Sequence, residues 1–376
     1  MTTRSRERIV VGLSGGVDSS VAALILRDRG LEVHGLFMTN WEEDEEGYCQ
    51  NAQDYQDASA VAEQLGIPLH RVNFARQYRD RVFEYFLREY RQGRTPNPDI
   101  LCNREIKFGI FLDYARRLGA SRIATGHYAR SDGDGRLRLA RDSGKDQTYF
   151  LHAVSADALR MSLFPIGGML KSEVRRLAKD ANLPTHDKRD STGICFIGER
   201  PFRDFLSRFI PAQPGEIHNE LGDVIGSHCG LMYYTLGQRQ GLGIGGHRQA
   251  EDAPWYVADK NIDNNVLVVV QGNDHPRLLS PKLEAGHCHW ISGRPPRFPL
   301  SCHARVRHRQ PLQACTVTQD KDRLRVLFEH PQRGIAPGQF VVFYEDDTCL
   351  GGGTILDSSR PCDDEGCRGE KGTRPA

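Results

Sequence analysis

The chain has 376 residues, of which 39% are hydrophobic and 26% are charged. This length exceeds what one hydrophobic core usually supports, so it favours a globular protein of about two or three domains and excludes a wholly disordered chain. Lys and Arg number 50 against 49 Asp and Glu, for a net charge of +1. A uniformly basic surface is therefore excluded, and any nucleic acid must be bound by local patches.

Targeting and disulfide signals are weak. No apolar run approaches the ~18 residues that a membrane span requires, and the apolar stretch near the amino terminus ends at Ser14, which does not fit a signal peptide. The ten cysteines are scattered and form no Cys-x-x-Cys pair. Because disulfide frameworks belong to small secreted domains, we expect a reduced, cytosolic protein.

The first half of the chain alternates strand and helix patterns. Buried strands are predicted at 8–13, 31–38, 69–74 and 123–126, and helices at 18–29, 53–65, 77–91 and 103–118. Strands that alternate with helices of these lengths predict an α/β domain with a parallel sheet covered on both faces. The turn Asp132-Gly-Asp-Gly135 predicts a hairpin inserted on that sheet.

The pattern changes after residue 205. Short β-branched segments separated by turns follow at 255–258, 266–270, 304–308, 315–317, 324–328 and 340–344. Asp263-Asn-Asn265 predicts a hairpin between the first two of them. Short strands at this spacing predict a small barrel or sandwich. The stretch 357–376 is rich in Gly, Pro and charge, and we expect it to be disordered.

A glycine-rich loop joins the first predicted strand to the first helix. Its residues are Gly12, Leu13, Ser14, Gly15, Gly16, Val17, Asp18 and Ser19. Glycines let the backbone approach an anion closely, and the helix amino terminus supplies N–H groups with a partial positive charge. Asp18 is unusual beside a phosphate unless Mg²⁺ lies between them. The chain has no G-x-x-x-x-G-K-[ST] string, which disfavours a Walker-type triphosphatase.

This loop, with its string Ser14-Gly-Gly-Val-Asp-Ser19, resembles that of the PP-loop ATP pyrophosphatase superfamily. The resemblance implies that ATP is cleaved between its α and β phosphates, that a substrate oxygen is adenylated, and that residues 12–19 hold the phosphates. By the same resemblance, Met38 and Gly126 line the adenosine pocket. From its apolar surroundings alone, Met38 would be a core residue.

Two cysteines stand in segments that suit reactive thiols. Cys102 comes directly before a predicted helix, where the helix dipole, Arg104 and Lys107 would favour the thiolate. Asp99 could move a proton at that thiol. Cys195 is flanked by glycines, which suits a mobile loop. Taken alone, each cysteine is better interpreted as an ordinary buried residue, and Asp99 as a helix cap.

Seven strings together resemble the tRNA-specific 2-thiouridylases over about residues 9–358. They are SGGVDSS (14–20), LFMTNW (36–41), NPDILCNREIKF (97–108), ATGHYAR (124–130), KDQTYFL (145–151), STGICFIGER (191–200) and YYTLGQRQGLGIGG (233–246). The fold that this implies is a PP-loop α/β catalytic domain at 1–204, a small linking domain at 205–275, a C-terminal β-barrel that binds tRNA at 276–358, and a disordered tail at 359–376.

The resemblance implies ATP-dependent 2-thiolation of the wobble uridine, position 34, in the tRNAs for Lys, Glu and Gln. ATP adenylates the oxygen on carbon 2, and a persulfide on Cys195 delivers sulfur, loaded by a sulfur-relay protein or a cysteine desulfurase. Cys102 either forms a disulfide with Cys195 or attacks as the nucleophile, and Asp99 is the acid/base. Asn97, Pro98 and Asp99 would bind the flipped-out base.

Contacts with tRNA are expected from polar side chains of both halves. By resemblance, the contact residues are Lys145, Asp146, Gln147, Arg307 and His308. Two groups of arginines, within 76–94 and 294–309, either contact RNA or form solvated charged faces.

Other interpretations stay open. A PP-loop synthetase that adenylates a small molecule would share the ATP loop but need neither Cys102 nor Cys195. A non-catalytic RNA-binding module with a degenerate loop is another alternative. The Cys and His residues within 287–303 fit no standard zinc finger, so we expect no metal site. An iron–sulfur cluster on Cys102 and Cys195 would have too few ligands to be the default.

Overall fold

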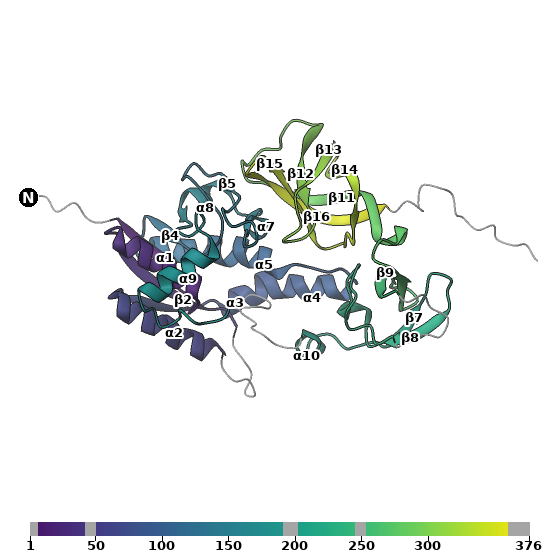
Figure 1. Ribbon diagram of the computed structural model, residues 1–376, viewed down its shortest axis with the longest axis horizontal. Helices are drawn as coiled ribbons and strands as arrows, with labels where there is room; N and C mark the ends of the chain where they lie inside the picture. The colour runs from purple at the N-terminus through teal and green to yellow at the C-terminus, as the bar shows by residue number, and fades with distance from the viewer. Residues whose placement is uncertain (1–6, 42–49, 191–201, 245–252, 360–376) are drawn as a thin grey trace, which may run out of the picture.

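The computed structural model describes residues 7–41, 50–190, 202–244 and 253–359. The molecule is elongated, with the parallel-sheet domain at one end and the barrel and the smaller middle sheet at the other (Figure 1). Within these ranges no helix has both the length and the apolar character needed to cross a bilayer.

The amino-terminal domain is built on five parallel strands in the order β3–β2–β1–β4–β6. In this order the strands are Leu69–Asn73, Glu32–Thr39, Arg8–Gly12, Arg122–Ala124 and Ser162–Leu163. The prediction of an α/β domain with a parallel sheet is confirmed. The edge strand β6 escapes sequence reasoning because two residues are too few for a hydrophobic pattern.

Helices cover both faces of this sheet. On one face lie α1 (Val17–Asp28), α2 (Gln50–Leu65) and α9 (Lys171–Asp180), which share an apolar cluster with β1 and β2. On the other face, a second cluster joins the sheet to a helical run made of α3 (Ala75–Tyr78), a π-helical turn (Arg79–Phe83) and α4 (Glu84–Arg91). Because helices cover both faces of the sheet, a ligand is expected to bind at the carboxyl ends of its strands.

A further helix on this second face begins earlier than predicted, at Pro98 instead of Asn103. It consists of α5 (Pro98–Leu101), a π-helical segment (Cys102–Ile110) and α6 (Phe111–Arg117). Pro98 suits the first helical position because its missing N–H needs no partner there and its φ is already helical. Cys102 therefore lies one turn inside the helix instead of preceding it.

The hairpin predicted at 132–135 forms, but it joins the barrel and not the parallel sheet. Arg130 and Arg138 exchange backbone hydrogen bonds of 2.9 and 2.8 Å across the turn. β5 (Leu137–Arg138) then pairs antiparallel with β16 (Thr348–Ser359). Turn residues specify a hairpin, whereas the sheet that it joins depends on packing between distant segments.

The middle domain follows the short helix α10 (Phe202–Ser207) and is a four-stranded sheet in the order β8–β7–β10–β9. In this order the strands are Val224–His228, Gly215–His218, Val266–Gln271 and Trp255–Asn261. β9 and β10 form the predicted hairpin, and Asn265 in its turn has a φ of 52°. Asn tolerates this left-handed conformation better than most residues.

The carboxy-terminal strands close into a barrel in the order β11–β14–β13–β12–β15–β16, and β16 pairs with β11 to complete it. The other five strands are Leu279–Trp290, Arg323–Arg333, Gln313–Asp320, Leu300–Arg305 and Phe340–Glu345. Of the barrel and sandwich alternatives, the barrel is confirmed. Asp357, Ser358 and Ser359, expected in a disordered tail, are instead residues of β16 that pair with β11. The rest of that predicted tail, from residue 360, lies outside the described residues.

Candidate active site

The glycine-rich loop connects β1 to α1 at the carboxyl edge of the parallel sheet. α1 begins at Val17, and Gly16 before it has no side-chain cap, so the first N–H groups of the helix have no partner within it and can bind an anion. Gly15 has a φ of +73°, and a Cβ there would lie 2.3 Å from the Asp54 carbonyl oxygen. Ser19 Oγ donates to the Gly16 carbonyl at 3.1 Å. The loop is thus a tight turn that requires glycine at this position.

Both residues predicted to line the adenosine pocket lie against this loop. A Cβ on Gly126 would come within 2.6 Å of the Ser19 amide nitrogen, so only glycine lets the two backbones approach. A Cβ on Gly12 would lie 3.7 Å from Met38 Cε, so the half-buried Met38 reaches the same edge while it packs on the core. Two other predicted loop residues bury their side chains in the core: Leu13 and Val17.

Lys171, the first residue of α9, neutralises the aspartate of the loop. Its Nζ lies 2.8 Å from each carboxylate oxygen of Asp18, and its side chain is 12% exposed. The Tyr128 hydroxyl also donates to Asp18, at 2.9 Å, and burial together with Asp18 raises the pKa of Tyr128. Lys171 was not among the predicted residues. One indication of it is present in the sequence. A lysine at the first position of a helix lies beside the positive end of the helix dipole, which favours anions, so its presence there is unusual.

Three cationic side chains contact the carboxylate of Asp190 beside the loop. Lys145 Nζ, Lys171 Nζ and Arg175 Nη2 each lie 2.7 Å from one of its carboxylate oxygens. Burial alone would raise the pKa of Asp190, but hydrogen bonds from Lys145 and Lys171 hold it well below its usual range. Lys145, expected to contact tRNA, is thus part of the loop cluster. Cations that converge on one carboxylate have the arrangement that binds a phosphate.

A second lysine that the sequence does not reveal supports the loop from its other side. Lys188 Nζ donates to the Gly15 carbonyl at 3.0 Å and to Asp54 Oδ1 at 2.7 Å, and it also contacts Asp57. Burial opposes the charged form, but these hydrogen bonds prevail and raise the pKa of Lys188. The glycine turn is therefore anchored by charged side chains from α2 and from the chain after α9.

Cys102 and Asp99 lie on the helix that begins at Pro98. Cys102 is 0% exposed and packs in the apolar cluster that contains Ile106 and Phe111. The expectation of a thiol that directly precedes a helix is therefore wrong, because the thiol is buried within it. Asp99 lies in the first turn and is half-buried. In this conformation Cys102 must be uncovered before it can react.

The barrel holds the chain just before this helix. The Thr95 amide donates to the Pro337 carbonyl at 3.0 Å, and Gln339 Nε2 donates to the Thr95 carbonyl at 2.8 Å. Gly338 lies so close that a Cβ on it would be 2.9 Å from the Thr95 nitrogen. The predicted base-binding segment 97–99 therefore follows directly on a contact between the amino-terminal domain and the barrel. Gln339 escapes sequence reasoning because it is 244 residues from its partner.

Asp146 is a buried residue of this same contact. Its carboxylate pairs with Arg305 Nη1 at 2.9 Å, with side-chain exposures of 2% and 9%. The Thr148 hydroxyl and the Ala140 amide also donate to that carboxylate. His308 Nε2 lies 2.9 Å from the Asp146 carbonyl oxygen. Asp146 thus fixes the barrel to the amino-terminal domain from the interior.

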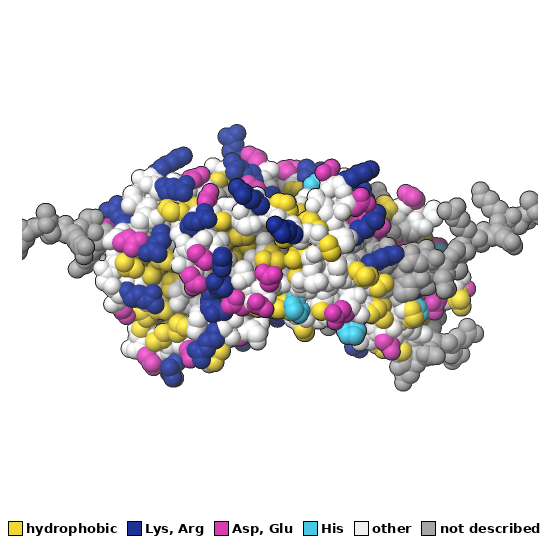
Figure 2. Space-filling model, turned by 90° about the horizontal axis from the view of Figure 1, so that it is seen from above, with side chains coloured by type: hydrophobic (Ala, Val, Ile, Leu, Met, Phe, Trp, Pro, Cys, Tyr) yellow, Lys and Arg dark blue, Asp and Glu magenta, His cyan; other side chains and the backbone are white. Residues whose placement is uncertain are grey.

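Arg307 and Gln147, also expected to contact tRNA, have partners within the protein. Arg307 Nη2 donates to the carbonyls of Leu236 and Gly334, at 2.6 and 2.7 Å, which ties the middle domain to the barrel. Gln147 Oε1 accepts from the Tyr128 amide at 2.8 Å. Figure 2 shows Lys and Arg side chains spread over one face of the molecule with Asp and Glu among them, in keeping with the balanced net charge.

Comparison with known proteins assigns most of the chain to one family. The family models described as tRNA methyl transferase HUP domain, tRNA methyl transferase PRC-barrel domain and Aminomethyltransferase beta-barrel domain match residues 7–199, 203–271 and 280–355. The chain is 56% identical over 359 residues to the tRNA-specific 2-thiouridylase MnmA of Hahella chejuensis, which covers 94% of this chain and 99% of the relative. The chain belongs to the tRNA-specific 2-thiouridylase family.

Two further 2-thiouridylases match as fully. The MnmA of Francisella tularensis subsp. novicida is 55% identical over 93% of this chain and 99% of its own length, and that of Stutzerimonas stutzeri is 56% identical over 94% and 96%. Solved structures align less well. The U34-tRNA thiolase NcsA from Methanococcus maripaludis has a TM-score of 0.34 at 19% identity, covering 54% of this chain and 63% of that chain. The assignment to the 2-thiouridylase family therefore rests on the sequence relatives.

The second thiol expected of a 2-thiouridylase, Cys195, lies outside the described residues. Before this gap, the last described residue is Asp190, in the cation cluster beside the phosphate loop. After it, the first described residue is Phe202, whose ring centroid lies 5.6 Å from that of Tyr90. The pairing of Cys195 with Cys102 thus stays a prediction.

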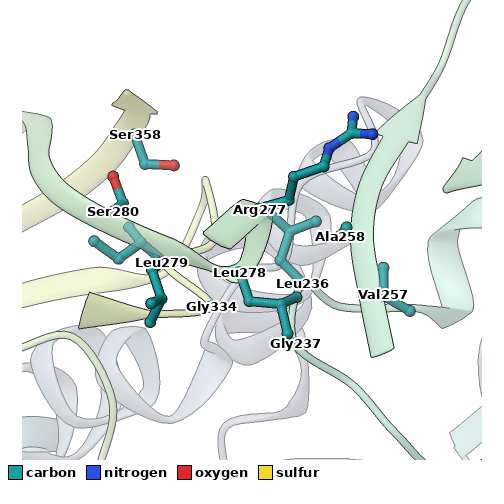
Figure 3. A pocket seen from close by; sticks show the side chains of 11 residues that line it. Leu236, Gly237, Val257, Ala258, Arg277, Leu278, Leu279, Ser280, Gly334 and Ser358 are labelled. Atoms are coloured by element: carbon teal, nitrogen blue, oxygen red, sulfur yellow. The ribbon is translucent and has the colours of Figure 1, made fainter. Parts of the chain in front are cut away.

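This 2-thiouridylase also has a pocket that lies apart from the loop. A small pocket is formed where the middle domain meets the barrel, between Leu236, Val257 and Leu278 (Figure 3), and none of its lining residues belongs to the phosphate loop or to the helix of Cys102. In the part of the chain that the structure describes, no three His, Cys, Asp or Glu side chains are grouped as metal ligands.

Proposed function

We propose that the protein is an ATP-dependent tRNA sulfurtransferase that converts the wobble uridine, position 34, of the tRNAs for Lys, Glu and Gln into 2-thiouridine. The observation that carries this proposal is the match to 2-thiouridylases at 56% identity over 94% of the chain, end to end in the relative. The loop at the carboxyl edge of the sheet supports it, because glycine backbone, helix amino terminus and converging cations suit a triphosphate.

In this proposal the loop residues 12–19 bind the phosphates of ATP, and Met38 and Gly126 bind its adenosine. Lys171 and Lys145 would move from Asp190 to the phosphates, since a triphosphate offers more negative charge than one carboxylate. Mg²⁺ would enter with the phosphates, and Asp18 is the one carboxylate among the loop residues 12–19. Because Lys171 already neutralises Asp18, Asp18 does not need the metal in order to lie beside the loop.

The chemistry has two steps. The oxygen on carbon 2 of the uracil attacks the α-phosphorus of ATP and releases pyrophosphate. The outer sulfur of a persulfide on Cys195 then attacks carbon 2, Cys102 attacks the inner sulfur, and AMP leaves with the former oxygen. This route ends in a Cys102–Cys195 disulfide, which a two-electron thiol reductant must reopen. Asp99 would serve as the acid/base, and a sulfur-relay protein or a cysteine desulfurase would reload the persulfide.

Substrate tRNA would lie across the nucleotide domain and the barrel. Asn97, Pro98 and Asp99 would bind the extruded base, and the anchoring of Thr95 by Gln339 places that segment at the boundary of the two domains. Of the predicted contact residues, Asp146 and Arg307 already have partners inside the protein, so their role would be to shape the surface. Lys145, Gln147 and His308 are half-buried, and each would contact tRNA by giving up its present partner, which is Asp190, the Tyr128 amide or the Asp146 carbonyl in turn. We also propose the domain boundaries at 204, 275 and 358.

The proposal is tested by incubating the full chain with ATP, a persulfide donor and unmodified tRNA, and measuring 2-thiouridine and pyrophosphate. We expect both products, and their loss in Cys102→Ser and Cys195→Ser. Cys288→Ser is the control, because this half-buried barrel cysteine has no proposed role. Full thiolation by either serine variant would contradict the mechanism. Pyrophosphate without tRNA would indicate the small-molecule synthetase, and ATP binding without turnover an RNA-binding module.

A further inference from the structure

The end of β2 carries buried polar atoms that the fold does not use. Within the described ranges, six buried side-chain nitrogen or oxygen atoms lack a hydrogen-bond partner, and three of them belong to Thr39 and Asn40. Asn40 is 0% exposed, and both Oδ1 and Nδ2 of its carboxamide are unpartnered. A buried polar group without a partner keeps its full desolvation cost. The stability of this conformation therefore does not explain why an amide stands there.

Other amides near Asn40 make at least one hydrogen bond. Asn51 Nδ2 donates to the Trp41 carbonyl at 2.9 Å, Asn73 Oδ1 accepts from the Ala75 amide at 2.9 Å, and Asn103 Nδ2 donates to the Phe150 carbonyl at 3.0 Å. Asn40 thus differs from its neighbours in having neither end of its carboxamide satisfied.

The position of Asn40 is where a ligand of this sheet would lie. β1 ends at Gly12, which pairs with Leu36, so β2 continues beyond the phosphate loop and Asn40 follows its last residue. Ligands of open parallel sheets bind at these carboxyl ends. Leu36 and Met38 pack in the apolar cluster that contains Cys102. The two-residue period of a strand puts Asn40 on that same face, which is the face of the cysteine in the proposed reaction.

We propose that the Asn40 carboxamide binds the edge of a nucleobase in the reacting complex. A carboxamide offers one acceptor and one donor side by side, which matches a base edge that presents a donor next to an acceptor. The uracil of the target nucleotide and the adenine of ATP both present such an edge. The inference rests on the proposed function, because that reaction brings these two bases to the site. Binding requires the side chains that cover Asn40 to move aside.

This role predicts opposite effects on stability and activity. Leu has the same branched arrangement of side-chain heavy atoms as Asn but no polar atoms, so Asn40→Leu removes two unsatisfied groups and is expected to keep or raise the melting midpoint. The same change removes both hydrogen bonds to the base, and kcat/KM for thiolation should fall by about 10- to 100-fold, the range for one bidentate contact. A residue that served the fold alone would instead lower the midpoint.

The experiment measures the melting midpoint and the thiolation kinetics of the unaltered full chain, Asn40→Leu and Asn40→Ala. The alanine variant is included because the leucine side chain could clash with its surroundings. Ser131→Ala is the matched control, since it also removes a buried unpartnered oxygen but lies in the hairpin beside the barrel. We expect the loss of kcat/KM in both Asn40 variants and not in the control. A rise in KM for ATP alone identifies adenine, and a rise in KM for tRNA alone identifies uracil.

Two results would overturn the inference: unchanged kinetics in both Asn40 variants, or a midpoint lowered by several degrees in both with activity lost in proportion to unfolded protein. Failure of the proposed function is a separate result, because it appears as absence of thiolation in the unaltered chain. In that case, binding of α,β-methylene ATP by calorimetry still tests the adenine contact. Weaker binding by Asn40→Leu supports it, and equal binding removes it.

Discussion

Lys145 and Asp146 are neighbours in sequence, yet their side chains enter two different electrostatic environments. The Lys145 side chain is 34% exposed and pairs with Asp190 in the cluster beside the phosphate loop. The Asp146 side chain is 2% exposed and pairs with Arg305 between the nucleotide domain and the barrel. A partly exposed pair can exchange its partner for a ligand at little cost, whereas a buried pair cannot be broken without leaving a charge in the interior. The first arrangement suits binding, and the second suits permanent attachment of the barrel.

The largest effect is expected from breaking the buried pair. Arg305→Leu leaves the Asp146 carboxylate without its cation, and we expect the free energy of unfolding to fall by about 3–5 kcal/mol. Guanidinium denaturation of the full chain measures this. Arg323→Leu is the control, because Arg323 pairs with Glu284 while 61% exposed, and its loss should stay below about 1 kcal/mol. Equal losses in the two variants would show that burial does not distinguish the pairs.

A fall in pH should weaken the contact between the barrel and the amino-terminal domain before it neutralises Asp190 beside the phosphate loop. His152 is 1% exposed and packs against Gly352 of β16, and burial lowers its pKa to about 4. The fold therefore favours neutral imidazole. Its contribution to stability is complete above about pH 6.5, the unfolded value, and is lost as the pH falls towards 4, by on the order of 3 kcal/mol.

The pH dependence of unfolding in the unaltered chain and in His152→Gln measures this contribution, and the variant should lose less stability between pH 6.5 and 4. Asp190 provides the contrast, because its depressed pKa keeps the loop cluster charged over the same interval. An identical acid profile for the variant would mean that another group, such as the nearby His289, is responsible.

Removing the central cation of the loop cluster should reduce activity more than stability. In Lys171→Met, Asp18 and any bound phosphate lose the same partner, so kcat/KM for pyrophosphate release should fall by roughly 10²-fold, as for a lost transition-state donor. The free energy of unfolding should fall by less than in Arg305→Leu, since the two carboxylates that lose Lys171, Asp18 and Asp190, are 31% and 34% exposed and stay in contact with water. Lys179→Met, at the exposed far end of the same helix, is the control. A comparable kinetic loss in Lys179→Met would contradict a specific role.

The smallest effect is expected from Tyr128→Phe, which removes only the hydroxyl that donates to Asp18 at 2.9 Å. Because Lys171 still holds Asp18, the loss of one hydrogen bond should raise KM for ATP by about fivefold, close to 1 kcal/mol. Steady-state kinetics of pyrophosphate release measure it. A loss as large as that of Lys171→Met would show that the hydroxyl, and not the cation, holds Asp18.

The elements of this chain were predictable where local chemistry decides them. Alternating apolar runs and the Gly15-Gly16 turn were enough to place β1, the loop and α1, and Asp263–Asn265 was enough for the β9–β10 hairpin. The start of the helix at Pro98 was also within reach, because proline directly after a cap residue marks a helix start.

Contacts between distant segments were not predictable in this way. Lys171 reaches Asp18 across 153 residues, and Gln339 reaches Thr95 across 244. The burial of Asp146 had no local signal either, since an aspartate in a polar stretch has the pattern of a surface residue. The sequence therefore placed the glycine-rich turn between β1 and α1, but not the lysines that organise the charge around it.

The pairing of β5 with β16 has a consequence for dissecting the enzyme. Leu137 and Arg138 belong to the first 204 residues, yet they complete a sheet whose other strands come from the far end of the chain. If the first 204 residues were expressed alone, β5 would have no partner strand and could pair with other copies. If the barrel were expressed alone, the edge of β16 that pairs with β5 would be exposed. The barrel is thus no detachable module, and gene fusions or truncations at residue 204 should yield insoluble halves.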